Sequence, residues 1–241
     1  MTTLSFNIKA LDVNLPTVRS LAEFCALPTL PPYDPKAKLP KAQDLPMMTA
    51  RRLTVGARLA ADLSVRMSKQ YQPQAAVFAS RHGELERNYH MLQALAQGTD
   101  VSPTDFAMSV HNAACGIAAI VAQQNIPISA VAAQENTLWA GLVESASLLS
   151  AGYQTVLLVC FDGKIPDFYA PLLPPEAIDY PFAVGLVLTA GSNVQVRLEP
   201  SLAKRALDKL PALEVARFLA GSDRELVVQL AGAQLICCKD S

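Results

Sequence analysis

Two residues of the sequence, His111 and Cys115, have the types and spacing of a thiol catalyst. The segment around them, 105–123, is predicted to form one helix, and residues four positions apart share a helix face. On such a face a histidine can take the proton of a cysteine, and the thiolate can attack an acyl carbonyl. A thiol in the middle of a helix is poorly accessible, and buried cysteine commonly packs as a small apolar side chain. We therefore favour a structural role for Cys115 and keep a stand-alone thiol enzyme, such as an acyltransferase, as the alternative.

A second candidate site lies where an apolar strand, predicted over 127–133, passes into a helix. The turn between them reads Gln134-Glu135-Asn136. Many α/β enzymes place a nucleophile at such a turn, beside the positive end of the helix dipole. Amides are not nucleophiles in acyl transfer. Glu135 could act as a base, but the helix dipole alone favours an acid at this position.

The motifs of metal sites, phosphate loops and serine hydrolases are missing from the sequence. His82, His90 and His111 are its only histidines, and none lies in an HExxH or paired-cysteine pattern. The five cysteines show no CxxC spacing, and no GxGxxG, GxxxxGK or GxSxG string occurs. We therefore expect neither a metal nor a cofactor. The odd number of thiols favours a reducing, cytoplasmic location.

The composition excludes several functional classes. Of the side chains 51% are hydrophobic and 17% charged, which excludes a disordered chain. Lys and Arg number 20 against 21 acids, so a nucleic-acid binder that relies on bulk positive charge is not expected. No apolar stretch is long enough to span a bilayer, and the N-terminus does not have the pattern of a signal peptide.

The charge deficit is concentrated in one segment, residues 88–163. This segment has no Lys or Arg at all, and only five acids lie within it. Charged side chains normally cover the solvent-exposed surface of a protein. We therefore expect the segment to be buried inside the fold or against a partner.

The order of hydrophobic patterns predicts an α/β layered fold in a single domain spanning 1–241. The doubly apolar strand at 156–161 is typical of the middle of a sheet covered by helices. The proline-rich stretch 28–46, with Lys36, Lys38 and Lys41, is expected to be an extended surface connection. Strands are predicted at 4–14, 74–79, 127–134, 156–161, 182–190, 193–199 and 225–236. Helices are predicted at 15–24, 49–67, 84–97, 105–123, 138–151, 201–209 and 212–220.

Three parts of the sequence carry a resemblance to a known family. They are SRHGELERNYHMLQALA (80–96), SPTDFAMSVHNAACG (102–116) and the strand–helix unit 127–152. Together they resemble the β-ketoacyl synthase-like N-terminal domain family, and within it the chain-length-factor subunits of aryl polyene biosynthesis. The resemblance implies a thiolase-like layered α/β/α fold. Because the sequence stops at residue 241, we expect a truncated version, roughly one thiolase half plus extra strands.

The resemblance also implies that the chain is not an enzyme on its own. In condensing ketosynthases the turn after the strand corresponding to 127–133 presents the acyl-accepting cysteine. Here that position falls on Gln134 or Glu135, and no histidine follows His111 to assist decarboxylation and stabilise the developing negative charge. The implied role is a chain-length-factor-like subunit that forms a heterodimer with a full-length ketosynthase. The growing chain would be held on an acyl carrier protein, which is expected to bind mainly through the ketosynthase.

The same resemblance indicates where this subunit would meet its partner and the growing chain. The strand would pair across the heterodimer interface, and the turn and following helix would line the end of the tunnel. Trp139 has core packing as its alternative role. A pure scaffold without influence on chain length is a further alternative. The residues assigned to tunnel and interface are Ile128, Ala130, Ala132, Gln134, Glu135, Trp139, Phe106, His111 and Asn112.

Overall fold

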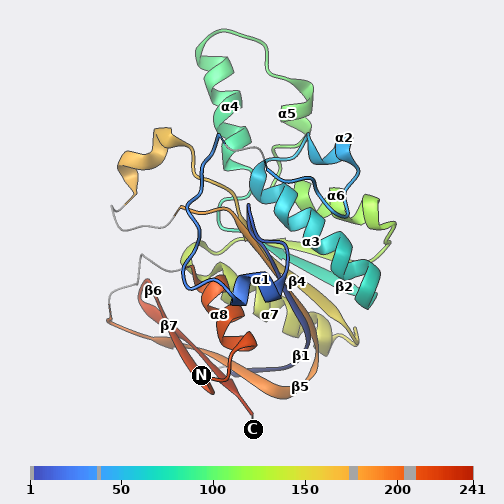
Figure 1. Cartoon of the computed structure of the whole chain (residues 1–241), viewed down its shortest axis with the longest axis vertical. Helices are drawn as coiled ribbons and strands as arrows, with labels where there is room; N and C mark the ends of the chain where they lie inside the picture. The colour runs from blue at the N-terminus through green and yellow to red at the C-terminus, as the bar shows by residue number, and fades with distance from the viewer. Residues whose placement is uncertain (1–2, 37–38, 174–178, 204–209, 241) are drawn as a thin grey trace.

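A mixed, seven-stranded sheet forms the centre of the computed structural model, which describes residues 3–36, 39–173, 179–203 and 210–240. Its strands run in the order β3-β2-β4-β5-β7-β6, with β1 paired to β5 (Figure 1). The strands are β1 (Thr3–Asn14), β2 (Ala75–Ala79), β3 (Ile128–Val131), β4 (Val156–Asp162), β5 (Phe182–Pro200), β6 (Glu225–Leu230) and β7 (Ala233–Lys239). The helices are α1 (Leu21–Cys25), α2 (Met47–Ala50), α3 (Val55–Tyr71), α4 (Leu85–Ala96), α5 (Pro103–Ala107), α6 (Ala113–Ala122), α7 (Thr137–Ser150) and α8 (Pro211–Ala220). Two 3₁₀ turns complete them, η1 (Gln134–Asn136) and η2 (Asp167–Leu172).

Strand β4 has an apolar core on both of its faces, as its sequence predicts. Alternate side chains of a strand point to opposite faces of the sheet. Val156 and Leu158 pack into the cluster that α7 and α8 cover, while Leu157 and Val159 pack into the cluster that α3 and α6 cover. The strand is parallel to β2 and antiparallel to β5. The expected α/β layered fold is therefore confirmed.

The C-terminal third differs from the prediction in how its strands are divided. The segments 182–190 and 193–199 form one strand, β5, whose first part pairs with β4 and whose last part pairs with β7. Strand β1 runs antiparallel along both parts, with shifts of register between Phe6 and Asn7 and between Ile8 and Ala10. The predicted strand 225–236 is instead the β6–β7 hairpin. Of the predicted helix 201–209, residues 204–209 lie outside the described residues, and 201–203 are not helical.

The predicted helix 105–123 was wrong, because it is two helices, α5 and α6, joined by a turn. Ser102 caps the first of them by accepting a hydrogen bond from the Asp105 amide at 3.3 Å. Helix α4 stabilises this turn, because its Asn88 Nδ2 donates a hydrogen bond to the Ser109 carbonyl at 3.3 Å. His111 therefore precedes α6, and Cys115 lies within it.

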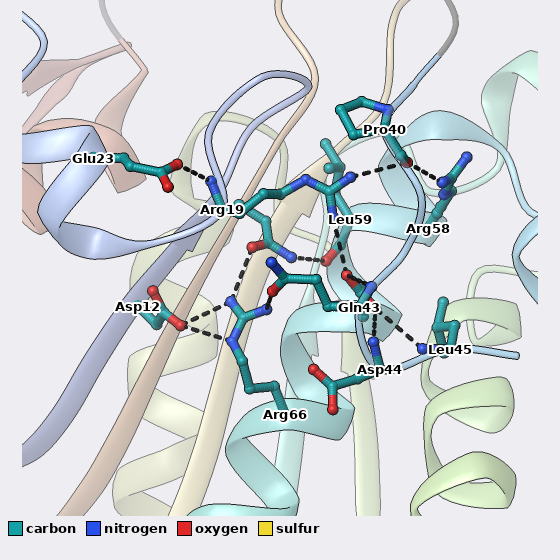
Figure 2. Close-up of polar contacts among 12 residues, drawn as sticks. Asp12, Arg19, Glu23, Pro40, Gln43, Asp44, Leu45, Arg58, Leu59 and Arg66 are labelled. Carbon is teal, nitrogen blue, oxygen red and sulfur yellow. Dashed lines mark hydrogen bonds and ion pairs between the residues drawn. The ribbon is translucent and has the colours of Figure 1, made fainter.

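Asp62 on α3 holds the proline-rich connection against the body of the protein. Figure 2 labels the residues of the connection that contact it, Gln43, Asp44 and Leu45. Its carboxylate is 1% exposed and accepts hydrogen bonds from the amides of Gln43, Asp44 and Leu45 at 3.2, 2.7 and 3.2 Å. Arg19 Nη1 donates to the same carboxylate at 3.2 Å. One buried charge thus ties α3 to the connection and to the segment after β1. The expected surface connection is confirmed for the part that the structure describes, and Lys38 lies outside it.

Helix α3 also meets the end of β4 at very short range. A Cβ added to Gly56 would lie 2.5 Å from the Gly163 amide nitrogen, closer than any side-chain atom can approach. Glycine at position 56 therefore allows the helix to press against the backbone that follows Asp162. None of the described helices has the length and apolar character needed to cross a membrane.

We predict that Asp62→Asn lowers the free energy of unfolding by about 3–5 kcal/mol, because the amide group faces N–H donors that a carboxylate oxygen had satisfied. Urea denaturation followed by circular dichroism measures the change. Asp44→Asn is the matched control, since Asp44 pairs with Lys69, whose side chain is 56% exposed, and its loss should cost under about 1 kcal/mol. Equal losses in both variants would contradict the central role of Asp62.

Candidate functional site

Strand β3 is a free edge of the sheet among the described residues. The carbonyls of Pro127 and Val131 accept hydrogen bonds from the β2 side, at 3.0 and 3.1 Å. Because backbone groups alternate in direction along a strand, those of Ile128 and Ala130 point away from β2. Ala130 is exposed and Ile128 is half-buried. Charged side chains on an edge strand disfavour its pairing with a strand of another chain, and β3 has none.

The chain turns sharply at Gln134, directly after this edge. Gln134 has φ +50°, in the left-handed region that a residue with a Cβ rarely adopts. Thr137 fixes the turn, because its hydroxyl donates to the Gln134 carbonyl at 2.7 Å and accepts from the Ala133 amide at 3.0 Å. Helix α7 begins at Thr137, so the turn lies at the positive end of its dipole. We call this turn, Gln134–Asn136, the elbow. The side chain at its left-handed position, Gln134, is an amide.

Glu135 is engaged in an ion pair, which favours a structural role over that of a base. Its carboxylate lies 2.8 Å from Arg81 Nη2. Arg81 belongs to the loop that follows β2, so the pair ties this loop to the elbow. The pair is partly exposed, and we expect it to contribute little to stability by itself.

The loop after β2 is anchored on Asp162, which sequence reasoning missed. Ser80 Oγ donates to Asp162 Oδ1 at 2.7 Å, and the His82 amide donates to the same oxygen at 2.9 Å. Burial raises the pKa of the Asp162 carboxyl from 3.8 to about 6. Its position directly after the apolar run 156–161, as the last residue of β4, was the available signal, since polar groups at the ends of buried strands often belong to sites.

These groups surround a cavity, which we call the elbow cavity. Arg81, Gln134, Glu135 and Asp162 line one part of it. Apolar side chains from the sheet, α7 and α8 line much of the rest, together with His82, Thr137, Asp179 and Tyr180. The apolar lining residues include Ala79, Leu138, Phe161, Ile165, Phe182, Leu210, Pro211 and Ala212.

His111 and Cys115 do not form the pair that the alternative of a thiol enzyme requires. His111 Nε2 lies 2.9 Å from the Ser80 carbonyl, so this nitrogen carries the proton. The ring fits against Gly83, where a Cβ would come within 2.7 Å of it. Cys115 is buried and donates its thiol to the Asn112 carbonyl at 3.0 Å, and burial raises the pKa of the thiol. The geometry around Cys115 therefore does not favour the thiolate that a thiol enzyme would use.

The remaining candidates do not gather at the elbow cavity. Trp139 on α7 is half-buried and packs against the core, which fits its alternative role. Ala132 is exposed between β3 and the elbow. Phe106 on α5 is 72% exposed. Asn112 precedes α6, and its carbonyl accepts hydrogen bonds from the Cys115 thiol and the Gly116 amide, both at 3.0 Å.

The charge-poor segment 88–163 is only partly buried inside the fold. Several of its large apolar side chains face solvent, from α4 through α5 and α6 to α7. They are Leu92, Leu95, Phe106, Val110, Ile120 and Val143. Of the two alternatives from the sequence, burial inside the fold therefore accounts for only part of the segment.

Comparison with known proteins places the chain in a family. The family model described as the β-ketoacyl synthase N-terminal domain matches residues 26–233. The chain belongs to this family. The comparison with curated proteins gives no match.

Solved structures agree with the family. The chain is 36% identical, with a TM-score of 0.90, to a chain in the complex of a ketosynthase (ApeO) with its chain length factor (ApeC) from Xenorhabdus doucetiae. That match covers 98% of this chain and 100% of the other. The ishigamide ketosynthase/chain length factor matches at 14% identity and a TM-score of 0.64, over 84% of this chain and 68% of the other. A β-ketoacyl synthase from Burkholderia phymatum STM815 matches at 12% and 0.56, over 83% and 65%. The last two likenesses concern the fold, and together the three confirm the thiolase-like architecture.

We predict that Asp162 makes stability fall as the pH rises from about 4 to about 6. Below its ordinary pKa of 3.8 the carboxyl is protonated in both states, and above it the folded state keeps the proton up to about 6 while the unfolded state loses it. Asp162→Asn keeps the accepting oxygen and removes the charge. Between pH 4 and pH 7, the free energy of unfolding of the variant should therefore increase by roughly 2–3 kcal/mol relative to that of the wild type. Urea denaturation across this range measures both curves, and parallel curves would refute the assignment.

We also predict a backbone effect at the elbow. Gln134→Gly should raise the free energy of unfolding by about 0.5–1 kcal/mol, because glycine adopts a positive φ without strain. Gln134→Val should lower it by more than 1 kcal/mol, since a β-branched residue tolerates this region least. Thermal melting compares the three proteins. The same stability for the glycine and valine variants would contradict a strained elbow.

Proposed function

We propose that the chain is a catalytically silent, chain-length-factor-like subunit of a ketosynthase heterodimer. The observation that carries the proposal is the turn at Gln134 and Glu135, because condensing ketosynthases would have their acyl-accepting thiol at one of these two positions and neither residue is a thiol. The conformation around it is maintained by Thr137 and by a left-handed backbone. Of the solved structures reported above, the most similar comes from a complex of a ketosynthase with its chain length factor, which supports the same role.

The ketosynthase partner would pair with the free edge of β3. A strand of four residues is too small by itself, because stable complexes bury about 1,200–2,000 Å² in total. The exposed apolar side chains of the charge-poor segment would supply the additional area, with Phe106, Val110 and Ile120 as the main candidates. His111 and Asn112 would act indirectly, by holding the turn between α5 and α6.

The heterodimer would extend acyl chains carried by an acyl carrier protein, with aryl polyene chains as the specific product class. All of the condensation chemistry would reside in the ketosynthase, which would also provide most of the carrier-protein contact. In this chain Ala130, Ala132, Gln134 and Trp139 would lie along the end of the tunnel. We place the complex in the cytoplasm, where its free thiols remain reduced.

The sheet offers an internal control for strand pairing at its opposite edge, β6. The Lys239 amide donates to the Arg224 carbonyl at 3.0 Å, which sets the hydrogen-bonded pairs of the β6–β7 ladder. By alternation, the backbone groups of Val227 point away from β7, as those of Ala130 point away from β2. Val227 is 44% exposed. Proline at either position therefore removes an outward N–H without breaking the ladder inside the chain.

We predict that Ala130→Pro weakens binding of the co-expressed ketosynthase at least about tenfold, because a cross-chain hydrogen bond is lost and the proline ring obstructs the edge. Val227→Pro should leave this affinity unchanged. Co-purification and the Kd by calorimetry give the readout, and thermal melting confirms that both variants fold. Wild-type affinity in folded Ala130→Pro, or a monodisperse wild-type chain that binds no ketosynthase at micromolar concentration, would overturn the proposed function.

A further inference from the structure

An open groove between α2, α5 and α6 shares no lining residue with the elbow cavity, and we call it the α5 groove. Its volume is about 350 Å³. Sites for small organic molecules typically measure about 300–1,000 Å³ and combine an apolar lining with a few placed polar groups. The lining residues of the α5 groove are Thr49, Arg52, Leu53, Pro103, Thr104, Ala107, Met108 and Ile117.

The apolar part of this lining is left uncovered by the packing of the chain. Met108 and Ile117 are half-buried, but neither belongs to the two core clusters of the described residues or packs against them. Ala107, the last residue of α5, is exposed, and its small side chain leaves the groove open. An alkyl chain placed here would gain roughly 25 cal/mol for each Å² removed from water.

The groove also carries one unmatched positive charge, on Arg52. Among the described residues its guanidinium has no hydrogen-bond or ion-pair partner, while its carbonyl accepts a hydrogen bond from Arg87 Nη2 at 2.6 Å. The acid of α5, Asp105, forms its ion pair with Arg87 instead. Arg52 is therefore available to an anion, and a guanidinium binds a carboxylate through two parallel hydrogen bonds.

These two features together select a class of ligand. The described lining holds no acid that would attract a cation and no second cation that a polyanion would need. A purely apolar ligand would leave the charge of Arg52 unused. An alkyl chain that ends in a single negative charge matches both the apolar surface and the guanidinium, and the hydroxyl groups of Thr49 and Thr104 add hydrogen-bond donors.

We propose that the α5 groove binds a free alkyl carboxylate of medium length, with its carboxylate on Arg52 and its chain against Leu53, Met108 and Ile117. In the proposed heterodimer such an acid would come from hydrolysis of an acyl thioester, in which the thioester and water give the free thiol, the carboxylate and one proton. This source rests on the proposed function, whereas binding of the acid by the groove does not.

Decanoate and 1-decanol test the proposal, because they have the same alkyl length and differ in charge. Titrated onto the full chain in a calorimeter at neutral pH, decanoate should bind saturably. The alcohol should bind roughly threefold to tenfold more weakly, since it lacks the ion pair with a partly solvated guanidinium.

Four variants separate the contributions of charge and of space. Arg52→Gln should weaken decanoate binding roughly threefold to tenfold and leave 1-decanol unchanged. Arg51→Gln is its matched control, because Arg51 is exposed and does not line the groove. Ala107→Leu should fill the groove and weaken both ligands about tenfold. Ala96→Leu is the matched control for it, because Ala96 is the exposed last residue of α4 and lies outside the groove.

The outcomes distinguish this inference from the proposed function. Circular dichroism shows which variants are folded. No saturable binding of decanoate, equal binding of decanoate and 1-decanol, or unchanged decanoate binding in folded Arg52→Gln would overturn the inference, even where the ketosynthase binds as proposed. The titration is then repeated on the co-purified complex, where retained binding supports the site and lost binding shows that the ketosynthase covers it, which would also overturn it. If no ketosynthase binds, the heterodimer proposal fails, while the titrations of the chain alone still decide this one.

Discussion

The buried carboxylate of Asp62 is the interaction on which the arrangement of the N-terminal half depends. It converts a proline-rich stretch that lacks regular structure into a fixed layer over α3, because three successive backbone amides and Arg19 point at one charge. Helix α3 is thereby held in place, and its first turn presses against Gly163 at the end of β4. The same end of β4 carries Asp162, so the support reaches the elbow cavity through backbone contact.

The region around the elbow combines a strained backbone with matched charges. The left-handed conformation of Gln134 costs free energy, and Thr137 together with the start of α7 maintains it. Around it, Asp162 accepts a hydrogen bond from Ser80, and Glu135 forms an ion pair with Arg81. These contacts stabilise the shape of the cavity and connect the loop after β2 to the turn that follows β3.

Sequence patterns predicted the elements best where burial dictates them. The doubly apolar β4 was placed within one residue, and α4 and α7 were found from their periodicity. The prediction failed for 105–123, because apolar residues continue across the turn between α5 and α6. Helix α5 ends and the chain changes direction where Ser109 contacts Asn88 and His111 contacts Ser80. Such contacts join residues about 20 or 30 positions apart, and no local pattern reports them.

The amino-acid sequence by itself determined which side chains are available and which segment is poor in charge. It places a glutamine and a glutamate at the turn after the apolar strand 127–133, and it leaves residues 88–163 without Lys or Arg. Only the tertiary structure decided which groups meet, with Arg81 beside Glu135 and Ser80 beside Asp162. Ser80 and Asp162 are far apart in the chain and become neighbours because β2 and β4 pair in parallel, so that their carboxyl ends meet at one edge of the sheet.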